Sequence, residues 1–372
     1  MAVSYHRLSR RCLLAAIGAS RAFANGAKGQ KGQMFEAEVE RYPDPTTEFQ
    51  VYRLTDPSYA STLPCRYNRV ISRNSGMLLY CSDRTGSPQA FRMDLKTGDS
   101  QQLTESENLD GNSLTLLPDN RSFCFFAGRT VYAASLGNLR ERPVYTAADQ
   151  WELTSAPHAM ADGARILLAE RKSGLSRLRS VTLAQGTART ILEAPFEIAA
   201  PIERPQHAQI SYRQRGKGVW LAGNDGKGNM ELKLAGGGIG PAFWSQDGKT
   251  LLYLNFPEEP GQLNSIREYT PESQTDKLVA KTSQYAVFAT NRDGTVYVGA
   301  SRNAASPTIL IMLRSVRREL TLCEHRASHP EQVSPMFSPD AQRIYFQSDR
   351  HGKPAIYALH VERLVERIEE AG

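Results

Sequence analysis

The stretch Phe243-Trp244-Ser245-Gln246-Asp247-Gly248, followed by the β-rich run Thr250–Leu254, shows the unit from which this chain is built. A polar turn ends one short strand, and a second strand follows at once. The turn signal recurs at seven marker positions: Gly76, Asn120, Gly163, His207, Gly248, Gly294 and Ala341. Successive markers are 44, 43, 44, 41, 46 and 47 residues apart. Periods of this length indicate a β-propeller or a helical array.

The runs between the markers decide between these two architectures. After each marker comes a run rich in β-branched and aromatic residues, such as Met77–Ser82 or Arg343–Gln347, and a second run follows, such as Ala90–Leu95 or Pro354–Leu359. Turn-forming residues bound these runs, and no helical period is sustained before the C-terminal tail. Four short strands fit each unit. The sequence therefore predicts an all-β fold, a seven-bladed β-propeller.

The ends of the repeat predict how the ring closes. The segment Val51-Tyr52-Arg53-Leu54-Thr55 reads as an outer strand without a blade of its own, whereas the seventh unit has no outer strand after Leu359. We expect the N-terminal strand to complete the last blade and to cover an otherwise exposed strand edge. This organisation gives a lead-in over 25–48, the propeller over 49–360 and a short helical tail over 361–372.

The first 24 residues have the pattern of an export signal. Ser9-Arg10-Arg11 precedes an apolar stretch from Cys12 to Ala19, and Ala22-Phe23-Ala24 offers the small residues of a cleavage site. Paired arginines directly before the apolar stretch are typical of a bacterial twin-arginine signal. A Sec signal and a wrongly chosen start codon are the alternatives. Export would place the protein in the periplasm or outside the cell, with no membrane span after cleavage.

The charge balance argues against nucleic-acid binding. The formal net charge of +6 includes four arginines of the signal, and no acidic residue leaves with them, so the mature chain would carry +2. Such a mixed surface lacks the concentrated positive field that nucleic acids require.

Candidate site residues are the positions seven and nine residues before each marker, expected on the innermost strands. The position seven before reads Arg69, Ser113, Ala156, Ala200, Pro241, Val287 and Ser334. The position nine before reads Tyr67, Gly111, Thr154, Ile198, Ile239, Tyr285 and Gln332. The two-residue period of a strand places both sets on one face, toward the channel.

This face is poor in acids, bases and metal ligands. Arg69 is its cation and is predicted to hold a carboxylate by a bidentate contact, with an inter-blade salt bridge as the alternative. Tyr67 and Tyr285 are predicted to stack on the ring of a bound ligand, unless they fill the channel.

Three longer segments resemble the oligogalacturonate lyases, seven-bladed propellers that act on pectin fragments. They are Ser348-Asp349-Arg350-His351-Gly352-Lys353-Pro354-Ala355-Ile356-Tyr357, Ala200-Pro201-Ile202-Glu203-Arg204-Pro205 and the opening stretch Phe243–Gly248. The likeness runs from about Val51 to Leu359, and its shorter pieces are shared with TolB-type propellers. It implies β-elimination: a base removes the proton beside the uronate carboxylate, a metal or Arg neutralises that carboxylate, and the C4 oxygen leaves.

The resemblance also implies manganese, held by three His and a Gln, with a further His as the base. The base falls on Pro241, and the His ligand of the sixth blade falls on Val287. The Gln, His and His of the seventh blade fall on His329, Gln332 and Ser334, and the His of the fourth blade falls on Ala200. Only His329 and Gln332 keep ligand atoms, and two such ligands hold a divalent ion weakly, although His325 could join them.

Two further arginines are candidates to hold a substrate carboxylate. The Arg that the family carries before Trp-Leu falls on Gly218, but Arg213 and Arg215 are close by in sequence. Arg204 keeps its place in the matched Ile-x-Arg-Pro run.

These observations leave two functional hypotheses of different classes, and whether the chain is an enzyme stays open between them. One is an exported lyase on short oligogalacturonides that works with relocated residues such as Arg69, His329 and Gln332. The other is a pseudoenzyme that binds an acidic oligosaccharide or a protein partner, and a TolB-type interaction propeller of the cell envelope is a third interpretation. We expect little lyase activity, because proline at position 241 cannot accept a proton.

Overall fold

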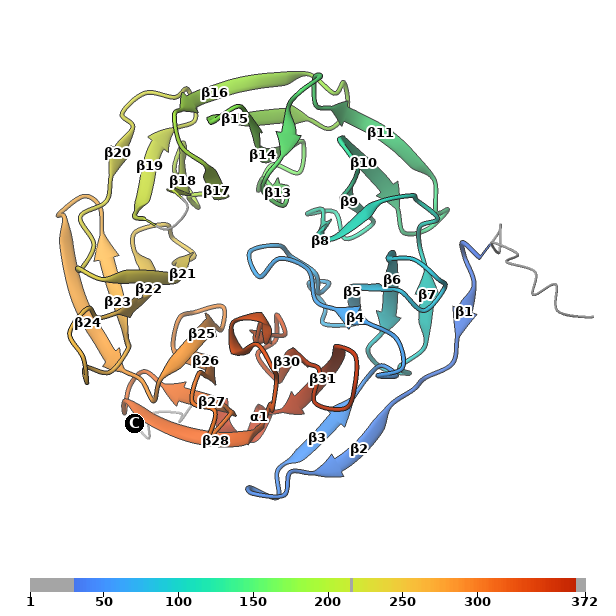
Figure 1. The fold of residues 1–372 in the computed structure, drawn as a ribbon, viewed down its shortest axis with the longest axis vertical. Coiled ribbons are helices and arrows are strands. Elements are labelled where there is room, and N and C mark those ends of the chain that lie inside the picture. The colour runs from blue at the N-terminus through green and yellow to red at the C-terminus, as the bar shows by residue number, and fades with distance from the viewer. Residues whose placement is uncertain (1–29, 215–216, 366–372) are drawn as a thin grey trace, which may run out of the picture.

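A computed structural model describes residues 30–214 and 217–365, and these residues form a ring of seven antiparallel sheets around a common axis (Figure 1). Each sheet is one blade of a propeller. The predicted seven-bladed, all-β fold is therefore confirmed. The segment 1–24, expected to be an export signal, lies outside the described residues. Among the residues that are described, no helix has the length and apolar character needed to cross a membrane.

The first three blades follow one another along the chain. Blade 1 contains β4 (Ser61–Thr62), β5 (Met77–Ser82), β6 (Gln89–Asp94) and β7 (Ser100–Gln102), with β1 (Met34–Phe35) at its outer edge. Blade 2 contains β8 (Leu109–Leu116), β9 (Ser122–Ala127), β10 (Thr130–Ser135) and β11 (Glu141–Thr146). Blade 3 contains β12 (Glu152–Leu153), β13 (His158–Ala159), β14 (Arg165–Lys172), β15 (Leu175–Thr182) and β16 (Ala188–Ala194).

The next three blades have four strands each. Blade 4 contains β17 (Ile198–Glu203), β18 (Gln209–Gln214), β19 (Val219–Gly223) and β20 (Met230–Glu231). Blade 5 contains β21 (Gly238–Trp244), β22 (Leu251–Phe256), β23 (Ser265–Thr270) and β24 (Thr275–Lys281). Blade 6 contains β25 (Tyr285–Thr290), β26 (Val296–Ser301), β27 (Thr308–Leu313) and β28 (Arg318–Glu324).

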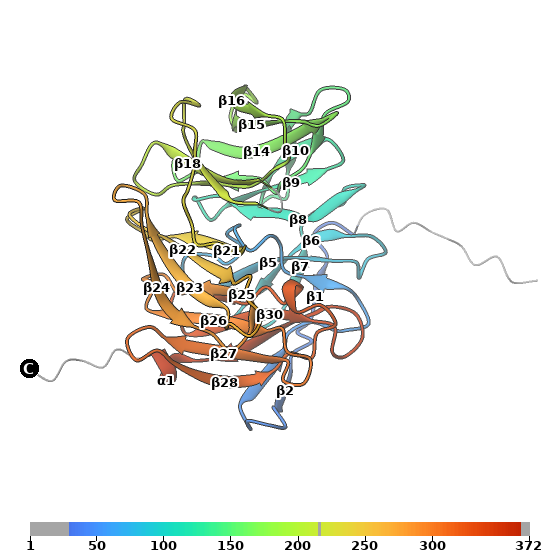
Figure 2. The ribbon, with the colours of Figure 1, turned by 60° about the vertical axis from the view of Figure 1, so that its left-hand side comes forward.

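Blade 7 combines the two ends of the chain. Its inner strands are β29 (Met336–Phe337), β30 (Arg343–Ser348) and β31 (Ala355–His360), and its outer strands are β3 (Gln50–Arg53) and β2 (Glu40–Pro43). Because β3 pairs with β31, the predicted closure by the N-terminal strand is confirmed. The helix α1 (Glu362–Val365), which lies near the bottom of Figure 2, follows β31. Leu364 packs against the core shared by blades 6 and 7.

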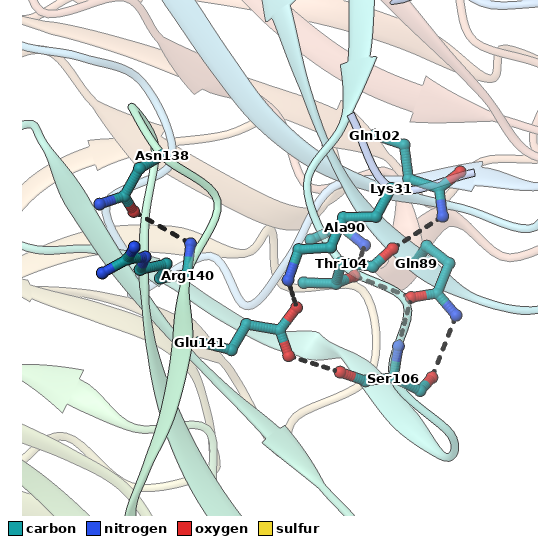
Figure 3. A network of polar contacts seen from close by, with 9 residues as sticks. All are labelled: Lys31, Gln89, Ala90, Gln102, Thr104, Ser106, Asn138, Arg140 and Glu141. Atoms are coloured by element: carbon teal, nitrogen blue, oxygen red, sulfur yellow. Dashed lines mark hydrogen bonds and ion pairs between the residues drawn. The ribbon is translucent and has the colours of Figure 1, made fainter. Parts of the chain in front are cut away.

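The N-terminal chain reinforces the closure from outside. Strand β1 pairs with β7 of blade 1, and the crossing segment, residues 36–39, leads from β1 to β2 of blade 7 (Figure 1). A polar network fixes the start of this chain (Figure 3). The Lys31 ammonium lies 2.5 Å from the Glu141 carboxylate of blade 2, which also accepts a hydrogen bond from Ser106. The lead-in therefore contacts blades 1, 2 and 7.

The hydrophobic core is divided among the junctions between blades. Blades 6 and 7, for example, share a cluster of aliphatic and aromatic side chains that includes Val287, Val298, Ile311, Ile344 and Phe346. Each blade thus buries one face against the preceding blade and the other against the next. Closure matters for stability because it supplies the junction between blades 7 and 1.

β-Bulges interrupt the inner strands. Because of them, the site residues do not all face the channel as the sequence predicted. In blade 6, Tyr285 lies opposite Ser301 but Val287 lies opposite Ala300, so one extra residue stands between them. Similar register shifts occur in β8, β17 and β21. An extra residue reverses the facing of the side chains beyond it. Tyr285 consequently packs toward blade 5 and Val287 toward blade 7, so the expectation of a common face is wrong here.

A segment of blade 1 fills part of the channel. Thr62 pairs with Cys81, and Ile71 pairs with Leu78. Thr62 and Ile71 are nine residues apart in the chain, whereas their partners in β5 are only three residues apart. The surplus residues, Leu63–Val70, form what we call the channel segment, which extends from β4 into the middle of the ring (Figure 1). This excursion places its side chains against blades on the far side of the channel.

Candidate functional site

The channel segment is held by blades that are far apart in the ring. On one side, Leu63 N donates to Gln347 Oε1 of blade 7 at 2.7 Å. Next to blade 2, Cys65 N donates to Asn112 O at 3.0 Å and Asn68 Nδ2 to Leu114 O at 3.0 Å. These main-chain and amide contacts fix the segment, since its own peptide groups cannot join a regular strand ladder.

Tyr67 reaches the opposite wall of the channel. Its ring centroid lies 5.5 Å from that of Phe243 on β21, and its hydroxyl is 3.4 Å from Ala242 N. The Tyr67 main chain also contacts the imidazole of His158 from blade 3. Tyr67 therefore does lie in the channel, where it packs against protein side chains.

Beside the channel segment, the chain entering blade 7 forms a short 3₁₀ turn, Pro330–Gln332. Proline at its first position suits the fixed φ of such a turn. The preceding loop is tied down because Asp349 Oδ1 accepts Ser328 N at 2.9 Å and Ser348 Oγ donates to His325 O at 2.5 Å. His329 and Gln332 then line one cavity of about 30 Å³, which suits one or two ordered water molecules and not a sugar ring.

The two predicted metal ligands are thus brought together, but their surroundings do not fit manganese. His329 is 65% exposed, with its Nδ1 3.4 Å from a Glu331 carboxylate oxygen. Gln332 is exposed, and its main-chain carbonyl oxygen accepts a hydrogen bond from Gln347 Nε2. Within residues 30–214 and 217–365, no three His, Cys, Asp or Glu side chains converge to hold an ion. One imidazole and one amide are a poor donor set for manganese.

The histidine expected to join this pair, His325, is occupied elsewhere. It is fully buried, its Nδ1 accepts Ala327 N at 3.0 Å, and its Nε2 lies 3.0 Å from Ser301 O. Because Nδ1 acts as acceptor, Nε2 carries the proton and donates to that carbonyl. Burial lowers the pKa of His325, so the imidazole is neutral and serves the structure of the loop.

The positions where the resemblance places imidazoles are apolar or small. Pro241 on β21 is buried, and Val287 on β25 is buried in the junction of blades 6 and 7. Ala200 and Ser334 have φ of +45° and +48°, a backbone conformation in which residues other than glycine are uncommon. The inner strands thus depart from regular strand geometry near these residues. None of the four positions carries an imidazole that could bind a metal or accept a proton.

Arg66 is the site residue that sequence reasoning missed. It lies on the channel segment, and one guanidinium nitrogen donates to Glu331 O at 2.8 Å, directly beside His329 and Gln332. The other terminal nitrogen is enclosed by protein atoms and has no hydrogen-bond partner, and Arg66 forms no ion pair with a carboxylate of the described residues. The sequence pattern did not indicate Arg66 because only positions seven and nine residues before each marker were expected to face the channel. Arg66 lies ten residues before Gly76. It is a half-buried cation without an anionic partner.

The arginine chosen from the sequence, Arg69, points elsewhere. Its guanidinium donates to Leu117 O, in the turn that follows β8 of blade 2. Partial burial and the nearby Arg73 lower its pKa, and the Asp119 carboxylate offsets part of this effect. Arg69 therefore makes an inter-blade contact to a main-chain carbonyl, away from the cavity of His329 and Gln332.

Two further predicted residues, Arg204 and Arg213, connect blades 4 and 5. Arg204 is 1% exposed and donates to Gly248 O, Gln209 Oε1 and Glu272 Oε1 at 2.6–2.7 Å. Arg213 donates to the carbonyls of Ile239 and Gly240 on β21. Both guanidinium groups already have protein acceptors, which indicates that these arginines stabilise the contact between blades 4 and 5. Arg215 lies outside the described residues.

Tyr285 is enclosed in a blade junction. It is fully buried, and a Cβ added to Gly299 would come within 2.3 Å of its ring, so the ring lies flat against the glycine. Burial raises its pKa well above the usual value, with the Glu319 carboxylate as a further cause. A tyrosine in this position has no face open to a sugar.

His158 on β13 was also not foreseen as a channel residue. Its Nδ1 is enclosed without a hydrogen-bond partner, and burial lowers its pKa from 6.5 to about 4. The unfolded chain therefore takes up this proton more readily than the folded protein. Its contribution to stability is complete above pH 6.5 and is lost as the pH falls toward 4.

We expect the free energy of unfolding to fall by about 3 kcal/mol between pH 7 and pH 4 through this one group. Guanidinium unfolding of the protein and of His158→Gln at pH 7, 6, 5 and 4.5 measures the effect. The variant should show a flatter dependence, with the remaining slope due to other groups such as His325. Equal slopes for the two proteins would contradict the assignment.

Comparison with known proteins agrees with the fold. No protein-family model matches the chain. The oligogalacturonide lyase of Pectobacterium atrosepticum is 23% identical over 384 residues, and the oligogalacturonate lyase of Dickeya dadantii is 24% identical over 387 residues. Each alignment spans 89% of this chain and 98% of the relative.

A solved structure, an oligogalacturonate lyase in complex with manganese, superposes with a TM-score of 0.84 at 24% identity, over 89% of this chain and 98% of that one. The resemblance inferred from the sequence is confirmed: over nearly nine-tenths of its length, this chain is similar to the oligogalacturonate lyases.

Proposed function

We propose that this propeller binds short oligogalacturonides at the channel mouth beside blade 7, and that its β-elimination activity is weak. Both relatives are named for these substrates, which supports an acidic oligosaccharide as the ligand class. Each ring of such a ligand carries one carboxylate. The ligand therefore needs fixed cations and hydrogen-bond donors on the protein.

The observation that carries the proposal is the unpaired guanidinium of Arg66. One terminal nitrogen of Arg66 donates to a main-chain carbonyl and the other is enclosed without an acceptor, so the positive charge of this half-buried side chain is not compensated there and attracts a carboxylate. The exposed side chains of His329 and Gln332 stand beside that carbonyl and can bind sugar hydroxyls. This grouping offers what an anionic sugar needs without a metal.

Weak catalysis follows from what surrounds the bound carboxylate. Removal of the proton next to a carboxylate requires both charge neutralisation and a base placed at the proton. Pro241 cannot act as a base, and the His329 imidazole is turned toward Glu331. The described residues at this mouth therefore support binding better than proton transfer.

Calorimetry with digalacturonate and trigalacturonate tests binding, and ultraviolet absorbance of the unsaturated uronate product tests elimination, with and without manganese. We expect saturable binding and little product. The absence of binding would overturn the proposed function. Robust turnover that depends on manganese and is lost in His329→Ala would overturn the proposed weak activity.

We also propose export through the segment 1–24, on the strength of its paired arginines. Fusion of residues 1–30 to a reporter that folds in the cytoplasm should direct that reporter across the membrane. Export that persists when Arg10 and Arg11 are both changed to lysine would contradict a twin-arginine signal.

A further inference from the structure

A second arginine lies at the same end of the ring as Arg66, on blade 6. Arg302 directly follows β26, and its guanidinium carbon stands 4.9 Å from the centre of the Phe256 ring of blade 5. The 3₁₀ turn Pro330–Gln332, whose carbonyl at Glu331 accepts Arg66, packs against β25 and β26. One turn therefore connects Arg66 to the strand that ends just before Arg302.

The main chain around Arg302 is fixed on both sides. The Arg302 amide donates to Gln284 O at 2.8 Å, and Ser301 Oγ accepts the amide that follows Arg302 at 3.1 Å. Ser301 O in turn accepts the imidazole of His325 at 3.0 Å. Because His325 opens the loop that carries His329, the same contacts hold Arg302 and the residues of the channel mouth in place.

The Gly-rich run Gly236–Gly240 explains how Phe256 supports this arginine. A Cβ added to Gly238 or Gly240 would come within 3.0–3.3 Å of carbon atoms of the Phe256 ring, so the ring lies directly against the main chain of β21. A Cβ added to Gly236 would meet no atom of the described chain within 4 Å, so open space adjoins this end of the run. The guanidinium thus rests on a fixed aromatic ring beside that space.

The charge of Arg302 is exposed and has no acidic partner. Arg302 forms no ion pair with a carboxylate among the residues that the structure describes. The acids of the neighbouring loop, Glu258 and Glu259, line a separate cavity together with Arg267 and Lys281, and Arg302 does not line that cavity. A guanidinium that packs on a ring keeps N–H groups at its edge for a planar acceptor such as a carboxylate.

We propose that Arg302 binds a second carboxylate of an oligogalacturonide whose first carboxylate is bound at Arg66. This inference rests on the proposed function and adds a preference for chain length. An oligogalacturonide carries one carboxylate on each ring, so an oligomer can contact both cations, whereas a galacturonate monomer can contact only one. The second contact is then made within the bound complex and raises the affinity for the oligomer alone.

Calorimetry on Arg302→Gln with trigalacturonate, and ligand-observed NMR with the more weakly bound galacturonate monomer, test this proposal. We expect the affinity for trigalacturonate to fall about fivefold, the size of effect that an exposed charge pair produces. The affinity for the monomer should change by less than about 1.5-fold, because the monomer binds at the half-buried Arg66.

Arg292→Gln is the matched control. Arg292 is exposed and lies in the turn between β25 and β26, at the opposite end of the same strand pair, so its replacement changes the net charge equally. This variant should bind trigalacturonate and the monomer as the unmodified protein does.

Unchanged affinity of Arg302→Gln for trigalacturonate would overturn the inference. An equal loss for monomer and trimer would also overturn it, and so would an equal loss in Arg292→Gln, which would reflect net charge alone. In each of these cases the proposed function stands if Arg66→Gln still weakens binding. If trigalacturonate does not bind to the unmodified protein, the proposed function and this inference are both refuted.

Discussion

Replacement of Arg66 by glutamine should weaken the binding of digalacturonate about thirtyfold, or about 2 kcal/mol, with the fold unchanged. The amide of the introduced glutamine can donate to Glu331 O in place of the guanidinium, so the local structure should be retained. What disappears is the positive charge at the channel mouth. Calorimetry on the two proteins measures the loss.

Two other arginines of blade 1, Arg73 and Arg69, provide control variants for this experiment. Arg73 is exposed and lies in the turn that ends the inner strand, next to Asn120, so Arg73→Gln is a control for net charge alone. Arg69→Gln tests the residue that the sequence register favours, and we expect a loss below threefold because Arg69 is directed to Leu117 O. A larger loss for Arg69→Gln than for Arg66→Gln would place the ligand deeper in the ring and refute the site.

Replacement of Arg204 by methionine should lower the free energy of unfolding by about 3–5 kcal/mol. Three acceptors from two blades, Gly248 O, Gln209 Oε1 and Glu272 Oε1, lose their donor. Stacking of the guanidinium over Trp244, at 4.9 Å, is lost as well. Methionine keeps most of the volume, so the effect reports polar contacts more than cavity formation.

Guanidinium unfolding monitored by tryptophan fluorescence measures this change. The matched control is Arg165→Met, because Arg165 pairs with Asp162 at 2.7 Å with its side chain 39% exposed, and an exposed pair contributes under about 1 kcal/mol. If Arg204→Met kept full stability but lost ligand binding, Arg204 would be a ligand residue after all, as its place in the Ile-x-Arg-Pro run suggests.

The fold could be predicted because each blade repeats the same local information. A turn residue such as Gly248 and the β-branched run after it specify a strand pair without reference to the rest of the chain. The closing strand was also predictable, since Val51–Thr55 lacked a partner in its own repeat. These features depend on spacing, which the sequence displays directly.

The positions of the site residues were harder to predict from the sequence, because they depend on places where the chain departs from the repeat. One extra residue in β25 turns Tyr285 and Val287 to opposite faces, and the sequence contains no separate mark of that bulge. The surplus residues of the channel segment place Arg66 beside Glu331, more than 260 positions later in the chain. Only His329 and Gln332, which are three residues apart, line a common cavity as the sequence suggested, because a short loop keeps neighbours together.

The channel segment has a consequence for the form in which a polymer can be used. The channel segment reaches from blade 1 to Phe243 of blade 5, so it occupies part of the space around the ring axis. We therefore expect a ligand of the proposed site to enter and leave from the side beside blade 7. Short oligogalacturonides should then bind better than a long polygalacturonate, which would reach the site only with its ends.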